Sequence, residues 1–298
     1  MASLVKDLIE AGIHFGHRAT NWNPKMKPYI FGKRNKIHII DVKQTIKGIL
    51  LARRFVTKVV AAGGDVLFVG TKRQARGCME RLVKETKMPY VTERWLGGTL
   101  TNFRTIRDRL KRLEELERIE ESGEIVNYSK KMESQLRREK AKILRNLEGI
   151  REMHELPKAL VIVDVKREVN AVKEAQKLGI PTVGLIDTDS DPDLVDIAIP
   201  GNDDAMRSIE VVIDSLCKAV MEGKAGRTAA AEGADAKDQV SSDGAGLRRR
   251  SSRARFRAEA EPDAPAPVES PAVTTQQAAP ASEPEPSASA PATSETLN

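Results

Sequence analysis

The chain has 298 residues, two cysteines and a formal net charge of +6. The charge is divided unevenly, because residues 1–227 carry a net +10 and residues 228–298 a net −4. A basic body is typical of nucleic-acid binding, although an anionic membrane surface would also attract it. Two distant cysteines exclude a disulfide framework and a zinc ribbon. The lack of a signal core or a long apolar run predicts a cytoplasmic protein with no membrane partner.

Hydrophobic spacing along the chain predicts a parallel α/β domain. Apolar residues recur at helical intervals over 4–13, an irregular stretch follows from 14 to 41, and the apolar run 65–70 is typical of a buried parallel strand. Strands and helices then alternate, which predicts a doubly wound, Rossmann-like parallel sheet of about five strands flanked by helices. The other expected elements are helices over 44–62, 73–87, 168–178 and 205–221 and strands over 90–91, 159–164, 181–186 and 197–199.

Two segments depart from this alternation. Over 103–150, apolar residues spaced by three or four on both sides of a Ser-Gly turn predict an inserted antiparallel coiled-coil hairpin. Residues 228–298 are so poor in large apolar groups that a disordered tail is expected. Residues 1–102 and 151–227 would then form the globular α/β domain. Within the tail, the arginine island 248–257 is either an extra RNA-binding segment or part of a charged linker.

A basic loop near the N-terminus is the first candidate binding segment. In residues 21–36, two prolines are expected to keep the backbone extended, and cations alternate with aromatic residues. Cations neutralise phosphates and aromatic faces stack on bases, so this composition indicates an RNA-binding segment. For Tyr29 and Phe31, anchoring the loop to the core is the alternative. The candidate RNA contacts in this loop are Trp22, Asn23, Lys25, Lys27, Lys33, Arg34 and Lys36.

Two further segments follow strands of the sheet, where open α/β sheets place ligands. Lys72 and Arg73 at a helix start would suit a phosphate, but P-loop spacing and the three-glycine dinucleotide motif are both missing. No cofactor is therefore predicted, and the phosphate is assigned to an RNA backbone. The motif 94–102 joins two glycines, which permit close backbone approach, to donors suited to phosphate and ribose. Its candidates are Arg94, Trp95, Gly97, Gly98, Thr99, Thr101 and Asn102, followed by Arg104 and Arg107 at the start of the insert.

Carboxylates are concentrated at the later strand ends. Turn formation and helix capping are the favoured interpretation for them. A hard-cation site in which His17 joins Asp187, Asp203 or Asp204 is the alternative, and no metal ligand is assigned. His14 and His17 have no serine or cysteine in a nucleophile context, so no catalytic residue, enzyme activity or small-molecule substrate is predicted. The carboxylates concerned are Asp164, Asp187, Asp189, Asp191, Asp193, Asp203 and Asp204.

Six motifs taken together resemble the bacterial small-subunit ribosomal protein two family over roughly residues 1–226. They are AGIHFGH (11–17), WNPKM (22–26), VGTK (69–72), RWLGGTLTN (94–102), PTV (181–183) and IPGNDDA (199–205). The resemblance implies a Rossmann-like fold with a protruding hairpin and a structural, non-catalytic place in the small ribosomal subunit. It implies small-subunit rRNA, neighbouring small-subunit proteins and the mRNA-binding ribosomal protein one as partners. It also implies rRNA contacts at 22–26, Lys72 and 95–102.

The leading hypothesis is therefore a cytoplasmic, rRNA-binding structural protein that supports assembly of the small ribosomal subunit. One alternative is a phosphate-ester or nucleotide-binding enzyme that uses Lys72, Arg73 and either Asp164 or Asp187. Another is an RNA-independent scaffold whose hairpin pairs with a second coiled coil. A steep dependence of RNA affinity on salt would favour the first hypothesis over both alternatives.

Overall fold

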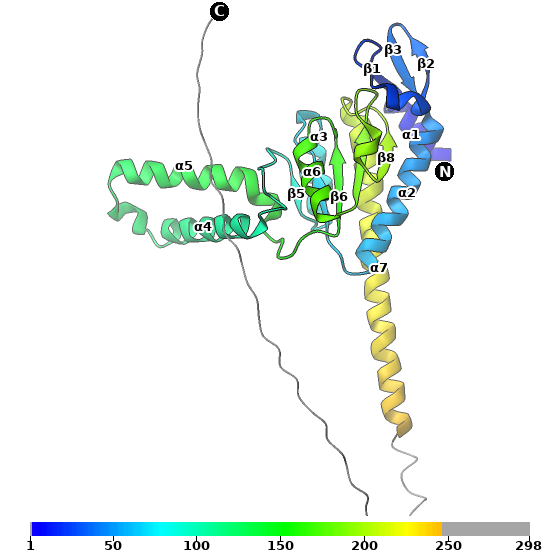
Figure 1. Cartoon of the computed structure of the whole chain (residues 1–298). Coiled ribbons are helices and arrows are strands. Elements are labelled where there is room, and N and C mark those ends of the chain that lie inside the picture. Colours follow the sequence, from blue (N-terminus) through cyan, green and yellow to red (C-terminus); the bar gives the residue numbers. More distant parts are fainter. Residues whose placement is uncertain (1, 246–298) are drawn as a thin grey trace, which may run out of the picture. The chain divides into compact units, whose positions relative to one another are not determined.

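Five parallel strands form the central sheet in the computed structural model of the chain (Figure 1). They are β4 (Val66–Val69), β5 (Tyr90–Val91), β6 (Ala159–Val163), β7 (Thr182–Ile186) and β8 (Ile197–Pro200), in the order β5-β4-β6-β7-β8. Because the strand order reverses between β4 and β6, their carboxyl ends form the topological switch point of a doubly wound sheet. The predicted Rossmann-like fold is confirmed. The structure describes residues 2–245; residue 1 and residues 246–298, with the arginine island, lie outside them.

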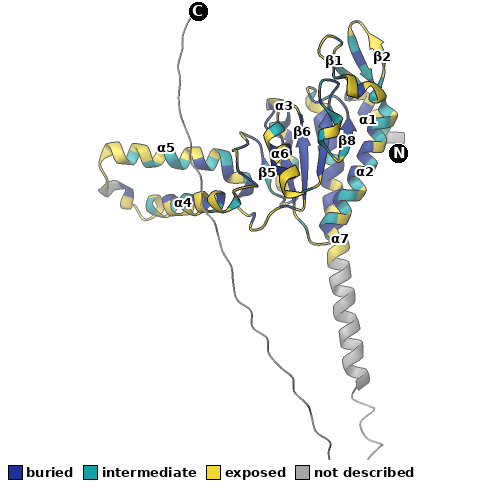
Figure 2. Ribbon diagram, in the orientation of Figure 1, coloured by how far each residue is buried: buried dark blue, intermediate teal, exposed yellow. Residues whose placement is uncertain are grey.

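Each face of the sheet carries its own hydrophobic core. Along β4, Val66 and Phe68 belong to one core, and Leu67 and Val69 belong to the other, because successive side chains point to opposite faces. All four residues are fully buried, as Figure 2 shows for the central strands. Helices from both ends of the chain cover the first core: α1 (Ala2–Glu10), α2 (Val42–Ala61), α3 (Arg73–Cys78) with its π-helical continuation Met79–Val83, and α7 (Met206–Ala245). The second core is covered by α6 (Val169–Leu178) and by the base of the insert.

The closing helix α7 is longer than the sequence pattern predicts. Its apolar face packs on the sheet through Ile209, Val212, Ile213 and Leu216, but the helix continues to Ala245, well past 221. The added segment is rich in alanine, which has the highest intrinsic helix propensity and needs no tertiary contact to favour the helical backbone. Among residues 2–245, no helix combines the length and apolar character needed to cross a bilayer.

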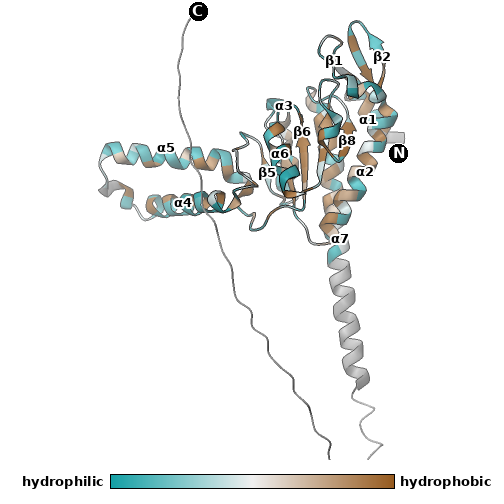
Figure 3. Cartoon of the chain, in the orientation of Figure 1, coloured by the Kyte–Doolittle hydropathy of each residue, from teal (hydrophilic) through white to brown (hydrophobic). Residues whose placement is uncertain are grey.

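The insert is a pair of antiparallel helices that projects from the β5 edge of the sheet (Figure 1). They are α4 (Phe103–Glu121) and α5 (Lys130–Leu147), followed by a 3-10 turn, Glu148–Ile150. Brown hydrophobic and teal hydrophilic segments alternate along both helices in Figure 3, and the buried apolar residues of the pair belong to the second core. At the turn, Gly123 has a φ of +74°, and the Ser129 hydroxyl caps α5 by accepting a hydrogen bond from the Met132 amide. The predicted helical hairpin is confirmed.

The stretch 14–41 is not irregular, and this expectation was wrong. It forms a second, antiparallel sheet of β1 (Phe15–Arg18), β2 (Ile30–Arg34) and β3 (Ile37–Ile40), in the order β1-β3-β2. The segment expected to be extended by its prolines contains a 3-10 helix, Pro24–Tyr29, because proline also fits the first turn of a helix. The β2–β3 hairpin closes on Asn35 and Lys36, both with positive φ, a two-residue connection that matches strand twist.

Candidate nucleic-acid interface

The β2–β3 hairpin and the 3-10 helix before it carry exposed cations and one exposed aromatic ring. Lys27, Lys33, Arg34 and Lys36 are all exposed, and Phe31 is 81% exposed, the largest value among the exposed large apolar side chains. None of these four cations has an ion pair among the described residues. We refer to these five residues as the basic tip. Phe31 therefore does not anchor the loop to the core, and its ring is free to contact a partner.

The other candidates of this loop are engaged within the protein. Trp22 is half-buried, and its ring lies 5.2 Å from that of His38. Asn23 caps the 3-10 helix by accepting a hydrogen bond from the Lys25 amide, and its own amide donates to the carbonyl of Thr188. The Lys25 ammonium lies 2.8 Å from both Asp191 and Asp193, and these contacts raise the pKa of Lys25. These residues join the loop to the sheet.

At the switch point, Lys72 is buried among carboxylates. Its ammonium lies 2.8 Å from Asp203, 2.8 Å from Asp204 and 3.3 Å from Asp164. Burial lowers the pKa of Lys72, but the hydrogen bonds to Asp203 and Asp204 outweigh it and raise the pKa above its ordinary value. Burial and the nearby Asp164 and Asp187 raise the pKa of Asp203 to about 7, despite Lys72. The protein's own ion pairs thus occupy the part of this crevice around Lys72, where other doubly wound sheets hold a nucleotide.

Next to these ion pairs, the residues that lead into α3 and α6 form a polar contact. The Thr71 hydroxyl donates to the buried Glu168, and the Arg167 guanidinium donates to the same hydroxyl at 3.1 Å. Burial raises the pKa of Glu168, although the Thr71 hydrogen bond opposes the rise. Arg73, the first residue of α3, is exposed. Of the residues following β4, Arg73 is therefore the cation available to an outside phosphate.

The motif 94–102 wraps around a single buried carboxylate, that of Glu174 on α6. Glu174 Oε1 accepts from the Trp95 indole at 3.1 Å and from the Gly98 amide at 2.8 Å. Its Oε2 accepts from the Leu100 amide at 2.9 Å and from the Thr101 amide and hydroxyl at 3.2 and 3.3 Å. Burial raises the pKa of Glu174, but these hydrogen bonds, that of Gly98 first, outweigh it and leave the pKa below its ordinary value.

Part of the motif is consequently turned inward. Trp95 and Thr99 are buried, and the Thr99 hydroxyl donates to the carbonyl of Leu96. Gly98 has a φ of +89°, whereas Gly97 is exposed with open space around it. Asn102 accepts a hydrogen bond from the Thr105 hydroxyl at the start of α4. Glu174 was missed in the sequence because an acidic residue on an amphipathic helix gives no sign that it will be buried.

Arg94, Arg104 and Arg107 border the insert. Arg94 and Arg104 are exposed. Arg107 donates to the carbonyl of Met153 at 3.1 Å and lies 3.0 Å from the His154 ring, so it fastens the base of the hairpin. Besides Arg104, the hairpin exposes further cations that were not sequence candidates, and all of these residues lack an ion pair in the described part of the chain. These hairpin cations are Arg104, Arg109, Arg118, Lys130, Lys131, Arg138, Lys142 and Arg145.

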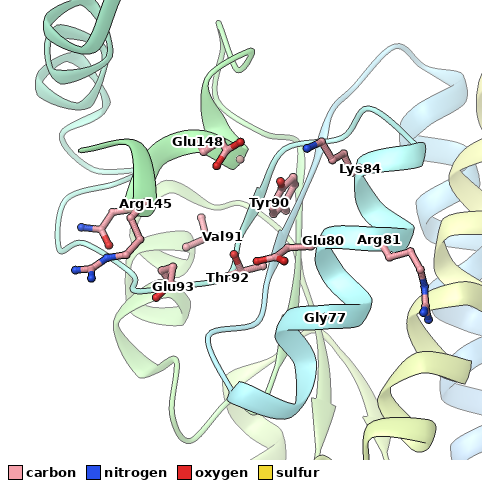
Figure 4. A pocket seen from close by; sticks show the side chains of 12 residues that line it. Gly77, Glu80, Arg81, Lys84, Tyr90, Val91, Thr92, Glu93, Arg145 and Glu148 are labelled. Atoms are coloured by element: carbon pink, nitrogen blue, oxygen red, sulfur yellow. The ribbon is translucent and has the colours of Figure 1, made fainter. Parts of the chain in front are cut away.

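A polar groove of about 560 Å³ lies where the hairpin meets the sheet (Figure 4). It is bordered by the π-helical turn after α3, by β5 and by the end of α5. Lys84 and Arg145 face it together with Glu80, Glu93 and Glu148. Because both charge signs line it, the groove has no clear preference for an anion over a cation.

A histidine and several carboxylates gather above β7 and β8. His17, Asp187 and Asp203 bring one potential ligand atom each within 4.8 Å of one another, an arrangement that could hold a divalent cation. His17 Nε2 lies 3.8 Å from Asp187 and 4.0 Å from Asp203, which exceeds hydrogen-bond distance.

Other carboxylates of this region act as predicted, in turns and caps. Asp191 accepts from the Asp193 amide and Asp164 from the Arg167 amide. The side chain before α7 that accepts two amides, those of Asp204 and Ala205, is Asn202 rather than an aspartate. Capping therefore accounts for these side chains without a ligand.

This doubly wound α/β domain pairs its switch-point lysine with its own carboxylates and carries exposed cations on two projections, and these features fit a structural protein. Residues 8–223 match the family described as Ribosomal protein S2. The chain is also 57% identical over 221 residues to the small ribosomal subunit protein uS2 of Rhodopirellula baltica, a match that covers 74% of this chain and 85% of that protein. The chain belongs to the ribosomal protein S2 family; it is a structural component of the small ribosomal subunit and not an enzyme.

Proposed function

We propose that the chain binds small-subunit rRNA through two basic surfaces, the basic tip and the hairpin cations. The observation that carries this proposal is that both surfaces present exposed Lys and Arg without ion pairs among the described residues. Free cations release counterions when they meet phosphates, whereas cations already paired with carboxylates gain little. Phe31 adds an exposed ring on which an unstacked base can lie.

The test is the salt dependence of rRNA affinity for a basic-tip variant. Lys33→Gln/Arg34→Gln/Lys36→Gln should weaken binding and reduce the slope of log affinity against log salt by about 1 for each phosphate that is no longer bound. The control is Lys47→Gln/Arg54→Gln/Lys58→Gln, which removes the same charges from exposed positions on α2. Equal losses of affinity in the two variants would mean that net charge alone drives binding and that the basic tip is not an interface.

Among the sequence candidates, Lys27, Lys33, Arg34, Lys36 and Arg104 lie on these two surfaces. We propose the exposed Arg73 and Arg94 as further rRNA contacts outside them. The family membership supports a place beside neighbouring small-subunit proteins, in the cytoplasm, with a part in subunit assembly. Docking of the mRNA-binding ribosomal protein one is a further proposal. It is tested by measuring whether small subunits depleted of this chain lose ribosomal protein one and regain it when the chain is added back.

A further inference from the structure

The loop 95–101 has the geometry of an anion-binding site. Three of its backbone amides, an indole N–H and a hydroxyl converge on one carboxylate, with Gly98 in the left-handed region. Convergent backbone amides of this kind form nests that hold phosphates and other anions in glycine-rich loops. Here the anion is supplied by the protein itself, from Glu174 in the middle of α6.

Glu174 is held by these donors alone. It is only 8% exposed, and among the described residues it forms no ion pair with a lysine or arginine. The charge is therefore neutralised by the dipoles of the loop, in the way a bound phosphate is neutralised by a nest. Without the carboxylate, the amides of Gly98, Leu100 and Thr101 would lose their hydrogen-bond partner, which is most costly for the buried Leu100.

The loop is continuous with the helical hairpin. The Asn102 amide donates to the carbonyl of Gly98, and the amides of Thr105 and Ile106 donate to the carbonyl of Asn102, so the first turn of α4 is built on the loop. A movement of the loop therefore moves the root of α4. The hairpin cations lie along the two helices of the insert. A small change in the angle at which α4 leaves the sheet therefore becomes a large displacement at the turn between α4 and α5.

We propose that Glu174 is a built-in anionic ligand, a positioning residue that occupies the nest of loop 95–101 and so fixes the direction in which the helical hairpin leaves the sheet. Once its carboxylate is removed, the nest becomes a binding site for a small free carboxylate. The consequence for rRNA affinity rests on the proposed function, whereas the anion site and the hairpin direction do not.

The anion site is tested on the full chain by chemical rescue. Glu174→Ala should lower the thermal unfolding temperature, and formate should restore part of that decrease where chloride at the same ionic strength does not. Glu152→Ala removes an exposed carboxylate near the hairpin base and should show no difference between the two salts. If formate and chloride act equally on Glu174→Ala, the nest does not select an anion and the proposal is overturned.

The positioning role is tested by a distance measurement between spin labels on Glu121→Cys at the hairpin turn and Lys58→Cys on α2, with Cys78 and Cys217 replaced by alanine. Glu174→Gln keeps the volume of the side chain but points an amide donor at other donors. We expect a narrow distance distribution to become broad in this variant while the helical circular dichroism is retained. An unchanged distribution would overturn the positioning role. A broad distribution with unchanged rRNA affinity would support it and would contradict instead the hairpin's share in the proposed function.

Discussion

At the scale of single residues, Lys72 shows how burial decides between two roles for the same side chain. In the sequence it stands after a strand and before a helix, where a lysine suits a phosphate. In the structure its ammonium contacts Asp164, Asp203 and Asp204 and the residue is 8% exposed, so it is the counter-ion of a buried acidic cluster. Substitution of Lys72 should therefore change mainly the folding stability of the protein.

Replacing Lys72 by methionine should destabilise the protein by about 3–5 kcal/mol at pH 8, since it leaves buried carboxylates uncompensated. The pKa of Asp203 is raised to about 7 in the folded protein, above its ordinary value of 3.8, so the folded state binds more protons between these pH values. Stability therefore falls as pH rises through this window, and more steeply without Lys72. Urea unfolding at pH 5 and pH 8 should show the larger defect at pH 8. The exposed Lys166, which pairs with Asp189, is the control; an equal effect of Lys166→Met would contradict the prediction.

The two adjacent glycines of loop 95–101 offer a matched comparison. Gly98 has a φ of +89°, while Gly97 has no positive φ, and a Cβ added to it would have no atom within 4 Å. Gly98→Ala should cost about 1–2 kcal/mol of folding stability, because a side chain strains the left-handed region. Gly97→Ala should be nearly neutral. Thermal unfolding of the two variants checks this, and equal shifts would show that the loop tolerates either conformation.

At the scale of elements, the strands and helices with strong periodicity were predictable and the small sheet was not. Continuous apolar runs such as 159–163 have one stable solution, a strand buried on both faces. The strands β1, β2 and β3 are four or five residues long and only partly buried, so they carry too few apolar positions to show alternation. The candidate site was limited in the same way, since sequence identifies donors such as Lys72 and Trp95 but not the carboxylates, Asp203 and Glu174, that accept from them.

The end of the hairpin packs closely against the edge strand β5 because residue 149 is a glycine, which has no side chain. A Cβ on Gly149 would overlap the carbonyl oxygen of Tyr90, which is backbone and cannot move without disturbing β5. Gly149→Ala should therefore destabilise the protein by about 1–3 kcal/mol through overpacking. Gly77→Ala on α3, where a methyl group meets open space, is the control. Chemical denaturation should show a clear decrease in stability for Gly149→Ala only; no decrease there would mean that the 3-10 turn shifts freely.

At the scale of the whole molecule, the two basic surfaces lie on separate structural elements of one folded domain. The basic tip lies on the β2–β3 hairpin and the 3-10 helix before it, and the hairpin cations lie on an insert between β5 and β6. They share no residue and no ion pair among the described residues, so substitutions in one should not alter the structure of the other. Their contributions to the free energy of rRNA binding should then add, because distant, independent sites are additive to within about 0.5 kcal/mol.

This additivity can be measured by co-sedimentation of the full chain with small ribosomal subunits over a range of salt. The variants are Lys33→Gln/Arg34→Gln/Lys36→Gln on the tip, Arg138→Gln/Lys142→Gln/Arg145→Gln on the hairpin, and the combination. Each triple should shift half-dissociation to lower salt, and the affinity of the combined variant should fall by the product of the two fold-changes. A combined variant no weaker than the worse triple would show that only one surface meets rRNA. A decrease far beyond the product would show that the surfaces are coupled through the body, which their separate positions in the fold argue against.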